Sequence, residues 1–484
     1  MAGSNPFLEG LRVKLARMQA GQEPGGKFDT SIIQGMIKAL EKAEADAAKQ
    51  AAVAVPAVVA VDIEEEEEVE AVQSPIKLCL FDLDDTLLRT DDLDPFRGQA
   101  NVGISSRPYT DNLLAAFGSR ADRSLYTLQQ LRELRRTYPD MKWGVFTRSP
   151  KHYATTLLTA AYPGLQWDAI VAYEDVRQTK PHPDGVWAAM SQCGVQYVDQ
   201  VALVGDGKVD IQSAYNSGCW CILDQSGWTW PWQSAYYYAV ERIPDAIITQ
   251  ASSLTRVLAH PKGYWPQMEY VLDDEAAMAG RTPRFDTINH FFPRPYNGRV
   301  PITMMGRLFG EYEALKHRRQ WHPLTAQIHE HKNSAQFPGN WIQAIRSYLL
   351  YQITPISNNC VVTVIPFKPG RPQRLEALLG QLAKAEQAEA IHEGCNFQFA
   401  PAVMAFRAGA VSSHGQHLTR EQRFSNVRDN LVVQQAETVR GQHVVVIDDV
   451  TTTGATLLWA HRYLMQAGAR SVSCMSLTKA VGVG

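Results

Sequence analysis

The sequence predicts the α/β fold class, arranged as two three-layer, parallel-sheet domains with a small N-terminal helical appendage. Short apolar strands alternate with helical segments over residues 77–260, and the same alternation begins again near residue 300. The chain has 484 residues, which is enough for about three domains. We therefore expect two large domains and one small one.

The charges are unevenly distributed along the chain. The formal net charge is −3, but residues 62–70 contain seven acids and no base. Removing these seven acids from a chain of charge −3 leaves +4 on the remainder, so the folded part is slightly basic. A run of like charges is typical of a self-repelling spacer, with a binding tail as the alternative.

The composition excludes several classes of protein. A hydrophobic content of 45% is too high for a disordered chain. The longest apolar stretch, residues 51–61, is too short to span a bilayer and contains Pro56, so no membrane partner is expected. No secretory signal is visible, and seven cysteines do not form a disulfide framework, so we expect a cytoplasmic protein.

Residues 1–45 are predicted to form a helical hairpin, followed by a flexible acidic linker over residues 46–76. The apolar positions of its two helices follow helical spacing: Leu8, Leu11, Leu15 and Met18, then Ile33, Met36, Ile37 and Leu40. A hairpin this small cannot bury its own apolar stripes. It therefore packs either on its own chain or on another protein or subunit.

The remaining sequence divides into two strand-rich parts. For residues 77–260, the predicted strands are Ile76–Phe81, Lys142–Phe146, Ala169–Tyr173, Val201–Val204, Trp220–Leu223 and Ala246–Thr249, with helices over Arg123–Tyr138 and Leu254–Leu258. Residues 261–299, rich in Pro, Arg and aromatic side chains, are interpreted as a connector. For residues 300–484, the predicted strands include Cys360–Ile365, Ala402–Phe406, His443–Ile447 and Ser471–Leu477.

Two carboxylates follow the first predicted strand. Asp82 and Asp84 stand two positions apart in the segment Phe81-Asp-Leu-Asp-Asp-Thr-Leu87. Catalytic groups in open α/β sheets gather at the carboxyl ends of strands. One carboxylate can attack as a nucleophile while the other transfers protons.

Three further motifs extend this pattern. Thr147 ends the next strand, Lys180 precedes a predicted helix, and Asp206 and Asp210 follow a later strand. In order and strand placement, the four motifs resemble those of phosphatases of the haloacid dehalogenase (HAD) superfamily. The resemblance implies a Rossmannoid HAD fold for residues 77–260.

The resemblance also implies roles for these residues. Asp82 would form an aspartyl-phosphate, while Asp84 would protonate the leaving group and then activate water. Thr147 and Lys180 would neutralise the transferring phosphoryl group. The carboxylates expected to surround a Mg²⁺ cofactor are Asp82, Asp84, Asp206 and Asp210.

The segment that would cap this site is short, since only about 35 residues separate Leu87 from the helix near Arg123. Members with small caps often accept large substrates or borrow a lid from a neighbouring domain. Arg89, Arg97 and Arg107 lie in the segment and could contact phosphate, with an ordinary solvated surface position as the alternative for each.

A second motif follows the His443–Ile447 strand. Asp448 and Asp449 are adjacent, and the Thr/Gly-rich loop after them opens a helix. Two adjacent carboxylates can bind vicinal hydroxyls, and a helix N-terminus can bind phosphate. This string resembles the motif that binds phosphoribosyl pyrophosphate (PRPP) in type I phosphoribosyltransferases (PRTases), and the stretch Gln416–Val427 resembles ComF-like members.

By this resemblance, residues 300–484 would bind PRPP as a substrate, with Mg²⁺ bridging its oxygens. Asp448 and Asp449 would bind the ribose hydroxyls, and Lys368 would face pyrophosphate together with the loop around residues 407–423. The residues expected to hold the 5′-phosphate are Thr451, Thr452, Thr453, Gly454 and Thr456. Typical ComF proteins begin with a four-cysteine zinc module that is missing here, and Cys219 and Cys221 are too closely spaced to replace it, so no zinc is expected.

Residues 281–320 contain eight bases against three acids, interleaved with aromatic side chains. Such mixing can bind nucleic acid by stacking and phosphate contact. The alternative is a hood over the transferase site, whose arginines face the phosphates bound there.

Two functions remain open at this stage. The first is a bifunctional phosphohydrolase and phosphoribosyltransferase that acts on a nucleotide, a nucleobase-like compound or another small phosphorylated metabolite. The second is a nucleic-acid-binding or sensor protein on a PRPP fold, whose HAD domain trims phosphate ends in repair or anti-phage stress.

Overall fold

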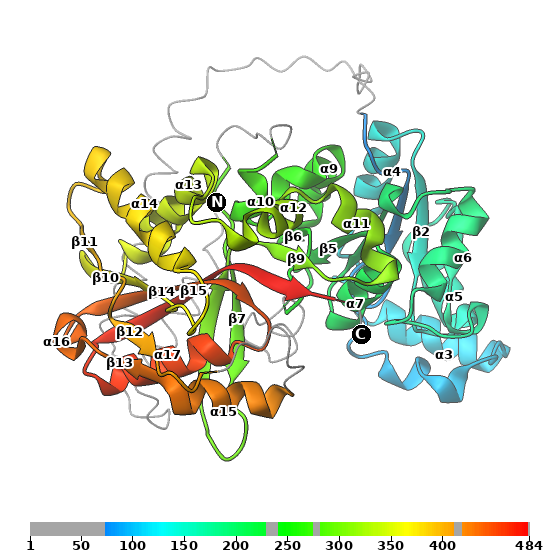
Figure 1. The fold of residues 1–484 in the computed structure, drawn as a ribbon. Helices are drawn as coiled ribbons and strands as arrows, with labels where there is room; N and C mark the ends of the chain where they lie inside the picture. Colours follow the sequence, from blue (N-terminus) through cyan, green and yellow to red (C-terminus); the bar gives the residue numbers. More distant parts are fainter. Residues whose placement is uncertain (1–72, 229–240, 274–280, 411–418, 483–484) are drawn as a thin grey trace, which may run out of the picture. The chain divides into compact units, whose positions relative to one another are not determined.

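The computed structural model describes residues 73–228, 241–273, 281–410 and 419–482 (Figure 1). The predicted helical hairpin, residues 1–45, and the linker up to residue 72 lie outside these ranges. Among the helices that are described, none combines the length and the apolar character needed to cross a membrane.

The first sheet has six parallel strands in the order β3-β2-β1-β4-β5-β6. Their bounds are β1 Leu78–Phe81, β2 Lys142–Phe146, β3 Ala169–Val171, β4 Val201–Gly205, β5 Trp220–Asp224 and β6 Ala246–Ile248. This order makes β1 and β4 neighbours, with Phe81 opposite Val204. Asp82 and Asp206 therefore leave the sheet side by side at its carboxyl edge.

Alternating side chains of the first sheet bury two layers of helices, because successive residues of a strand point to opposite faces. Cys79 and Phe81 pack in the cluster formed with α4 (Leu128–Thr137), α5 (Lys151–Ala161) and α9 (Leu254–Ala259). Leu78 and Leu80 pack in the cluster formed with α6 (Asp184–Cys193) and α7 (Lys208–Ser217). The result is the expected three-layer arrangement, with α3 (Arg107–Gly118) in the small cap segment.

The second sheet has seven strands, ordered β11-β10-β14-β15-β8-β7, with β9 paired to the far end of β15. Their bounds are β7 Asp286–Phe291, β8 Arg299–Met304, β9 Arg307–Phe309, β10 Asn359–Val364, β11 Asn396–Phe399, β14 His443–Thr451 and β15 Ser471–Val481. All neighbours are parallel except β7 and β8, which form an antiparallel hairpin.

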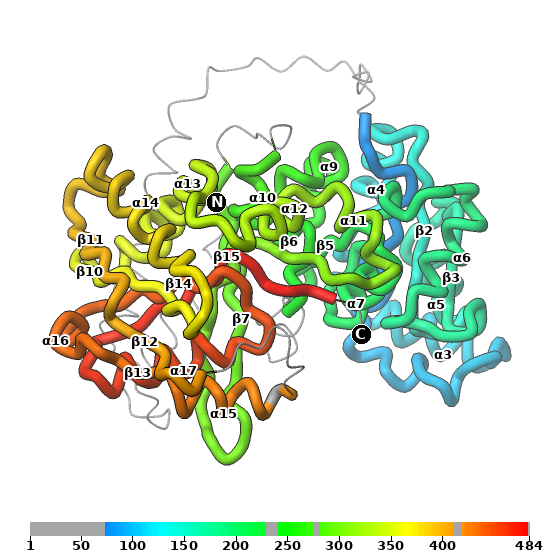
Figure 2. The backbone as a smooth tube through the Cα atoms, viewed as in Figure 1, coloured from blue at the N-terminus to red at the C-terminus, as the bar shows by residue number. Residues whose placement is uncertain are grey.

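Helices cover both sides of the second sheet (Figure 1, Figure 2). The helices of this part are α10 Gln267–Tyr270, α11 Lys316–Trp321, α12 Pro323–Glu330, α13 Gly339–Tyr348, α14 Arg374–Ala388, α15 Arg420–Asn430, α16 Ala436–Val439 and α17 Ala455–Gln466. The tube in Figure 2 places α13 and α14 on one side of β14 and β15, and α15 and α17 on the other. Helix α17 follows β14 directly, so its N-terminus lies at the carboxyl edge of the sheet.

Two sequence-based expectations differ from the observed fold. The predicted strand Ala402–Phe406 is β12 (Met404–Phe406), which pairs antiparallel with β13 (Leu431–Val433) in a separate ribbon instead of joining the parallel sheet. The segment 261–299, interpreted as a connector, contributes α10 and β7. Strand β7 belongs to the second sheet because its buried side chains, among them Ile288, complete the core of that part.

The two sheets share part of one apolar core. Phe309 of β9, Leu315 and Val481 of β15 are all buried in the cluster that covers one face of the first sheet. They pack there with residues of α7 and β5. Phe309 and Val481 therefore lie in strands of the second sheet, while their side chains pack in the core of the first sheet.

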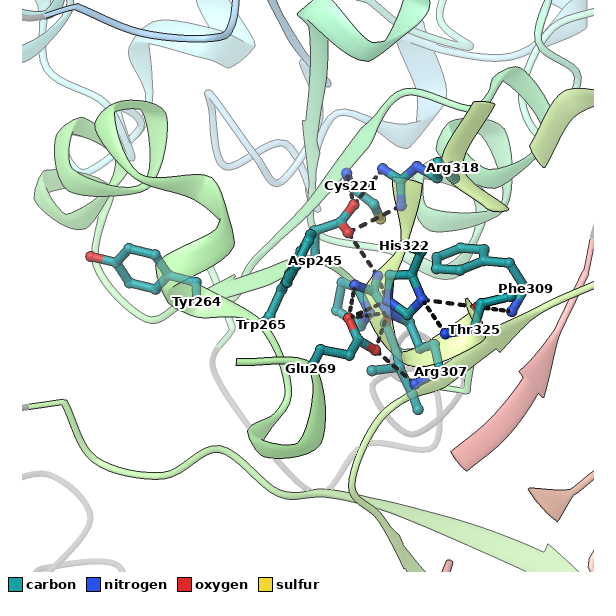
Figure 3. Close-up of polar contacts among 12 residues, drawn as sticks. Cys221, Asp245, Tyr264, Trp265, Glu269, Arg307, Phe309, Arg318, His322 and Thr325 are labelled. Carbon is teal, nitrogen blue, oxygen red and sulfur yellow. Dashed lines mark hydrogen bonds and ion pairs between the residues drawn. The ribbon is translucent and has the colours of Figure 1, made fainter. Parts of the chain in front are cut away.

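Beside this core lies a buried ionic network, drawn in Figure 3, where Asp245, Arg307 and Arg318 point toward one another. Arg307 Nη1 lies 2.7 Å from Asp245 Oδ1, and Arg307 Nη2 lies 2.6 Å from Glu269 Oε2. Arg318 donates to Asp245 and to the carbonyl oxygens of Gly218 and Cys219.

This network corrects one reading of the basic segment 281–320. Arg307 and Arg318 do not face phosphates at the transferase site, because both are buried against acids at the junction of the two parts. Arg284 likewise pairs with Asp286. These arginines neutralise carboxylates of their own chain.

Candidate functional site

The first candidate site is built where β1, β4 and α7 meet. Asp82 follows β1, and its backbone N–H donates to the carbonyl of Val204 at 2.8 Å, which fixes the start of the loop. Lys180 is buried, and its Nζ lies 2.7 Å from Asp82 Oδ1 and 2.7 Å from Asp210 Oδ1. The lysine thus links two predicted acids from different elements.

Three of the four predicted metal ligands lie together. Asp82, Asp206 and Asp210 each offer an oxygen, and these atoms lie within 4.8 Å of one another. Burial and the charges of Asp210 and Asp82 raise the pKa of Asp206 well above its usual value. Burial raises the pKa of Asp82 to about 7, although Lys180 opposes the shift. Such crowded carboxylates favour a cation, and hard oxygen donors suit Mg²⁺, so the residues present fit that ion.

The charge of Lys180 is maintained by the same acids. Burial alone would lower the pKa of this amine, but the charges of Asp210 and Asp82 raise it above its usual value. The Nζ therefore stays cationic although it is buried. A fixed positive charge of this kind can neutralise a phosphoryl group during transfer.

Asp84 is not part of this carboxylate group. Its oxygens accept hydrogen bonds from Thr90 Oγ1 at 2.8 Å, Ser149 Oγ at 2.6 Å and Tyr153 OH at 3.0 Å. Thr147 Oγ1 lies farther from it, at 3.4 Å. These donors fix the orientation of the Asp84 carboxylate beside the cluster.

Sequence reasoning missed Thr90, Ser149 and Tyr153 as supports of Asp84. A weak signal existed for Ser149, which stands two residues after Thr147 at the end of β2 and donates its backbone N–H to the Thr147 hydroxyl. No local pattern marks Thr90 or Tyr153, because each reaches Asp84 only through the tertiary fold.

One arginine of the cap segment reaches the site. Arg97 Nη1 lies 3.2 Å from Asp84 Oδ1, and its other nitrogens hold Asp94 at 2.6 Å. Arg89 instead donates to the carbonyl of Gly227, and Arg107 is a surface residue near Asp111. Of the three arginines named in the cap, the structure therefore brings only Arg97 to the predicted catalytic residues.

A cavity of about 740 Å³ lies at this first candidate site. Its inner part is formed by Asp82, Asp84, Thr147, Asp206 and Asp210. Its outer part is formed by the cap segment around Gln99 and by Arg148, Tyr173 and Arg177, among others. The volume lies within the range of about 300–1,000 Å³ that is usual for small-molecule sites.

The second candidate site lies at the N-terminus of α17. Gly454 caps this helix with φ +74°, a left-handed conformation that glycine adopts without strain. A Cβ added there would lie 2.5 Å from His290 Cδ2 of the β7–β8 hairpin. The glycine therefore lets the loop approach β7 closely and leaves the first amides of α17 open to a ligand.

The two acids ahead of this loop differ in their surroundings. Asp448 is buried, and both burial and the neighbouring charge of Asp449 raise its pKa well above the usual value. Asp449 lies 2.8 Å from Arg374 Nη1 at the start of α14. Arg374 was not predicted, since it stands 75 residues away in the sequence.

The loop and its neighbours enclose a small cavity of about 110 Å³. Its lining includes the predicted residues Lys368, Asp448, Thr451, Thr452, Thr453, Gly454 and Thr456, together with Arg423 and Asn426 of α15. The buried Thr451 hydroxyl has no hydrogen-bond partner among the described residues. Arg407, expected near this site, instead donates to the carbonyl of Asp429.

Comparison with known families matches both parts. A family model described as haloacid dehalogenase-like hydrolase matches residues 121–223, which include Thr147, Lys180, Asp206 and Asp210. A second, described as phosphoribosyl transferase domain, matches residues 380–480.

Curated relatives match the first part only partially. The chain is 26% identical to a phosphoglycolate phosphatase of Photorhabdus laumondii over 122 residues, which cover 25% of this chain and 50% of the relative. It is 32% identical to a phosphoglycolate phosphatase of Escherichia coli K12 over 76 residues, which cover 16% of this chain and 30% of the relative. The chain thus spans half or less of the length of these relatives.

Solved structures also align with the first part. A predicted phosphoglycolate phosphatase from Haemophilus somnus is 19% identical, with a TM-score of 0.28, over 38% of this chain and 98% of that chain. CbbY from Rhodobacter sphaeroides, in complex with phosphate, is 17% identical, with a TM-score of 0.25, over 37% of this chain and 96% of that chain. From the two family matches, this single chain carries a haloacid dehalogenase-like hydrolase domain followed by a phosphoribosyl transferase domain.

Proposed function

We propose that the hydrolase domain is a Mg²⁺-dependent phosphatase that works through an aspartyl-phosphate. The observation that supports this most directly is the grouping of Asp82, Asp206 and Asp210, of which Asp82 and Asp210 also contact the buried Lys180 amine. Carboxylates and a fixed cation at one strand edge provide both the nucleophile and the charge neutralisation that phosphoryl transfer needs.

In this mechanism, a carboxylate oxygen of Asp82 bonds to phosphorus while the bond to the leaving oxygen breaks. Asp84, oriented by Ser149 and Tyr153, protonates that leaving oxygen and then takes a proton from the water that hydrolyses the aspartyl-phosphate. Lys180 and Thr147 contact the transferring oxygens. Asp82, Asp206 and Asp210 would hold Mg²⁺, which would supply further positive charge at the phosphoryl group.

The test is hydrolysis of p-nitrophenyl phosphate with and without Mg²⁺. We expect Asp82→Asn to abolish turnover, because an amide is not a competent nucleophile. Asp94→Asn is the matched control, since Asp94 also lines the cavity and pairs with Arg97 but lies outside the carboxylate group. Full activity of Asp82→Asn would overturn the nucleophile assignment.

For the second domain, we propose PRPP-dependent transfer of ribose 5-phosphate to a base-like acceptor, or the reverse cleavage. The phosphate cradle at the N-terminus of α17 supports this, since it offers backbone amides, threonine hydroxyls and the unpartnered Thr451 hydroxyl to a phosphate. Asp448 and Asp449 would bind the ribose diol. Arg423 and Asn426, which come from the stretch that resembles ComF-like members, line the same cavity.

The test of transfer is pyrophosphate release from PRPP in the presence of a panel of nucleobases. Asp448→Asn combined with Asp449→Asn should stop release, because the ribose hydroxyls lose their acceptors. Binding of PRPP without pyrophosphate release from any acceptor would favour a sensor over a transferase.

The alternative of a nucleic-acid-binding protein would have to use only part of the basic segment 281–320, such as the exposed Arg294, Arg299 and Lys316. Arg307, Arg318 and Phe309, three of its basic and aromatic residues, are buried at the junction of the two domains. A mobility-shift experiment with single-stranded oligonucleotides at several salt concentrations tests this alternative directly. Small phosphorylated metabolites and PRPP remain the partners we propose, and the cytoplasm the location.

A further inference from the structure

The cavity of the hydrolase domain contains more positive charge than the proposed phosphatase reaction uses. Six acids and three bases line it: Asp82, Asp84, Asp85, Asp94, Asp206 and Asp210 with Arg97, Arg148 and Arg177. One of the three bases is paired, since Arg97 contacts Asp84 and Asp94. Arg148 and Arg177 remain.

Neither of these two arginines has an ion-pair or hydrogen-bond partner among the residues that the structure describes. The acids nearest to Arg177 in the sequence are engaged elsewhere. Glu174 accepts from the backbone of Lys151 at 2.7 Å, and Asp175 accepts from Lys151 Nζ at 2.6 Å. The two guanidinium groups are therefore exposed cations at the wall of an acidic cavity.

Their positions in the chain explain why they face the same cavity. Arg148 stands between Thr147 and Ser149 at the end of β2, and Arg177 lies in the loop that leads to Lys180. Both segments thus carry a residue of the proposed catalytic group and, one to three positions away, an arginine on the outer wall. Since Arg148 and Arg177 are exposed while Lys180 is buried, the arginines lie nearer the opening than the reacting phosphoryl group.

The outer cavity is a formed space. The side chain of Gln99 in the cap segment donates to Tyr173 OH at 3.0 Å, which joins the cap to the loop before Arg177. The cavity of about 740 Å³ is large for a single phosphate with a short alcohol. The part of the substrate beyond the scissile phosphate therefore has to fill the outer cavity and complement its two arginines.

We propose that the phosphatase acts on a phosphomonoester that carries a second anionic group at its far end, which Arg148 and Arg177 bind. This inference rests on the proposed phosphatase function and names its substrate class. Guanidinium groups bind both phosphate and carboxylate through paired N–H donors, so the second anionic group can be either of the two. The second group orients the ester, so that the scissile phosphate enters the inner cavity first.

The test uses three series of substrates built on α,ω-alkanediols and hydroxyalkanoates of increasing chain length. The first carries one phosphate and a free hydroxyl, the second carries two phosphates, and the third carries one phosphate and one carboxylate. For each length, the ratio of kcat/KM of the doubly anionic ester to that of the monophosphate reports the contribution of the second anion. Comparing the last two series distinguishes phosphate from carboxylate.

We expect this ratio to exceed about tenfold at one chain length, as for a charge-assisted hydrogen bond, and to fall toward one in the double variant Arg148→Met, Arg177→Met. Arg136→Met is the matched control, since Arg136 is an exposed arginine of the same domain on α4, outside the cavity. Far-ultraviolet circular dichroism checks that each variant is folded.

Two negative results have different meanings. A wild-type ratio near one at every length, or a ratio that the double variant retains, would overturn the second-anion site while leaving the phosphatase intact. Absence of hydrolysis of all three series and of p-nitrophenyl phosphate would overturn the phosphatase function, and with it the substrate class.

Discussion

Arg307 of β9 and Asp245 of the hydrolase domain form an ion pair of 2.7 Å in which both side chains are almost completely inaccessible to solvent. Arg318 binds the same carboxylate at 2.6 Å, and Glu269 binds Arg307 from the other side. The pKa of Asp245 is lowered in spite of its burial, because the charges of Arg318 and Arg307 outweigh the cost of desolvation. The network therefore connects the phosphoribosyl transferase domain to the hydrolase domain through buried, paired charges.

Removing the central arginine should destabilise the whole chain. We expect Arg307→Met to lower the free energy of unfolding by about 3–5 kcal/mol, because Glu269 and Asp245 lose a buried countercharge. Urea denaturation measures the change. Arg319→Met is the control, since Arg319 pairs with the exposed Glu311, and it should cost less than about 1 kcal/mol. Equal losses would contradict the account.

The same network predicts a pH dependence. Burial alone would raise the pKa of Glu269, but the charges of Arg307 and His322 hold it well below its usual range. The unfolded chain therefore takes up the proton first, and the stability from Glu269 is fully present above about pH 4.3 and is lost as the pH falls below that value. The difference in Tm between wild type and Glu269→Gln should thus be larger at about pH 6 than at about pH 3. A difference that grows toward low pH would contradict this sign.

Substitution of Asp206 should have opposite effects on stability in the absence and presence of Mg²⁺. Without metal, Asp206→Asn should raise Tm, because burial and the charges of Asp210 and Asp82 disfavour a third carboxylate there. With Mg²⁺ at about 100 times its Kd, the wild type should gain about 2.7 kcal/mol, and the variant should lose most of this gain. Differential scanning fluorimetry with Mg²⁺ and with EDTA measures both effects. The exposed Asp140→Asn should respond to Mg²⁺ like the wild type.

In the second domain, Arg374→Met should weaken PRPP binding by about tenfold, measured by isothermal titration calorimetry. Asp449 would lose the cation that orients it at 2.8 Å. Lys384→Met, an exposed change on the same helix, is the control. Unchanged affinity of Arg374→Met would show that the ion pair has no part in the ligand site.

Gly454→Ala should reduce both stability and PRPP affinity. A left-handed alanine costs about 1–2 kcal/mol, and its Cβ would lie 2.5 Å from His290. The double variant Gly454→Ala, His290→Ala should recover part of the stability, because it removes the contact but not the backbone strain. Thermal unfolding and PRPP titration of both variants separate the effect of the His290 contact from the effect of the backbone strain.

The sequence identified the parts whose signal is local. Strand Lys142–Phe146 was predicted with its observed bounds because an apolar run between polar segments needs only local information. The adjacent Asp448 and Asp449 before the Thr/Gly loop were found for the same reason. The family matches confirm the two domain types, while the roles of individual residues stay proposals.

The remainder depends on partners that are distant in the sequence. Strand β7 was missed because its polar residues and the prolines after it gave no clear strand pattern. The burial of Arg307 could not be foreseen, since its partners Glu269 and Asp245 stand 38 and 62 residues earlier. Most arginines are exposed, so the sequence alone predicts an exposed Arg307. Only the folded chain brings Glu269 and Asp245 close enough to pair with it.

The shared core has a consequence for biosynthesis. Phe309, Leu315 and Val481 complete the apolar cluster that α6 and α7 form on one face of the hydrolase sheet, whose own strands end at Ile248. During translation, the sheet with α6 and α7 leaves the ribosome long before these three residues, so the part of the cluster that they cover stays exposed until synthesis has passed Val481. A nascent chain in this state presents an apolar surface of the kind that chaperones bind. The apolar cluster of the hydrolase domain, although that domain precedes the phosphoribosyl transferase domain, is therefore among the last parts to be completed.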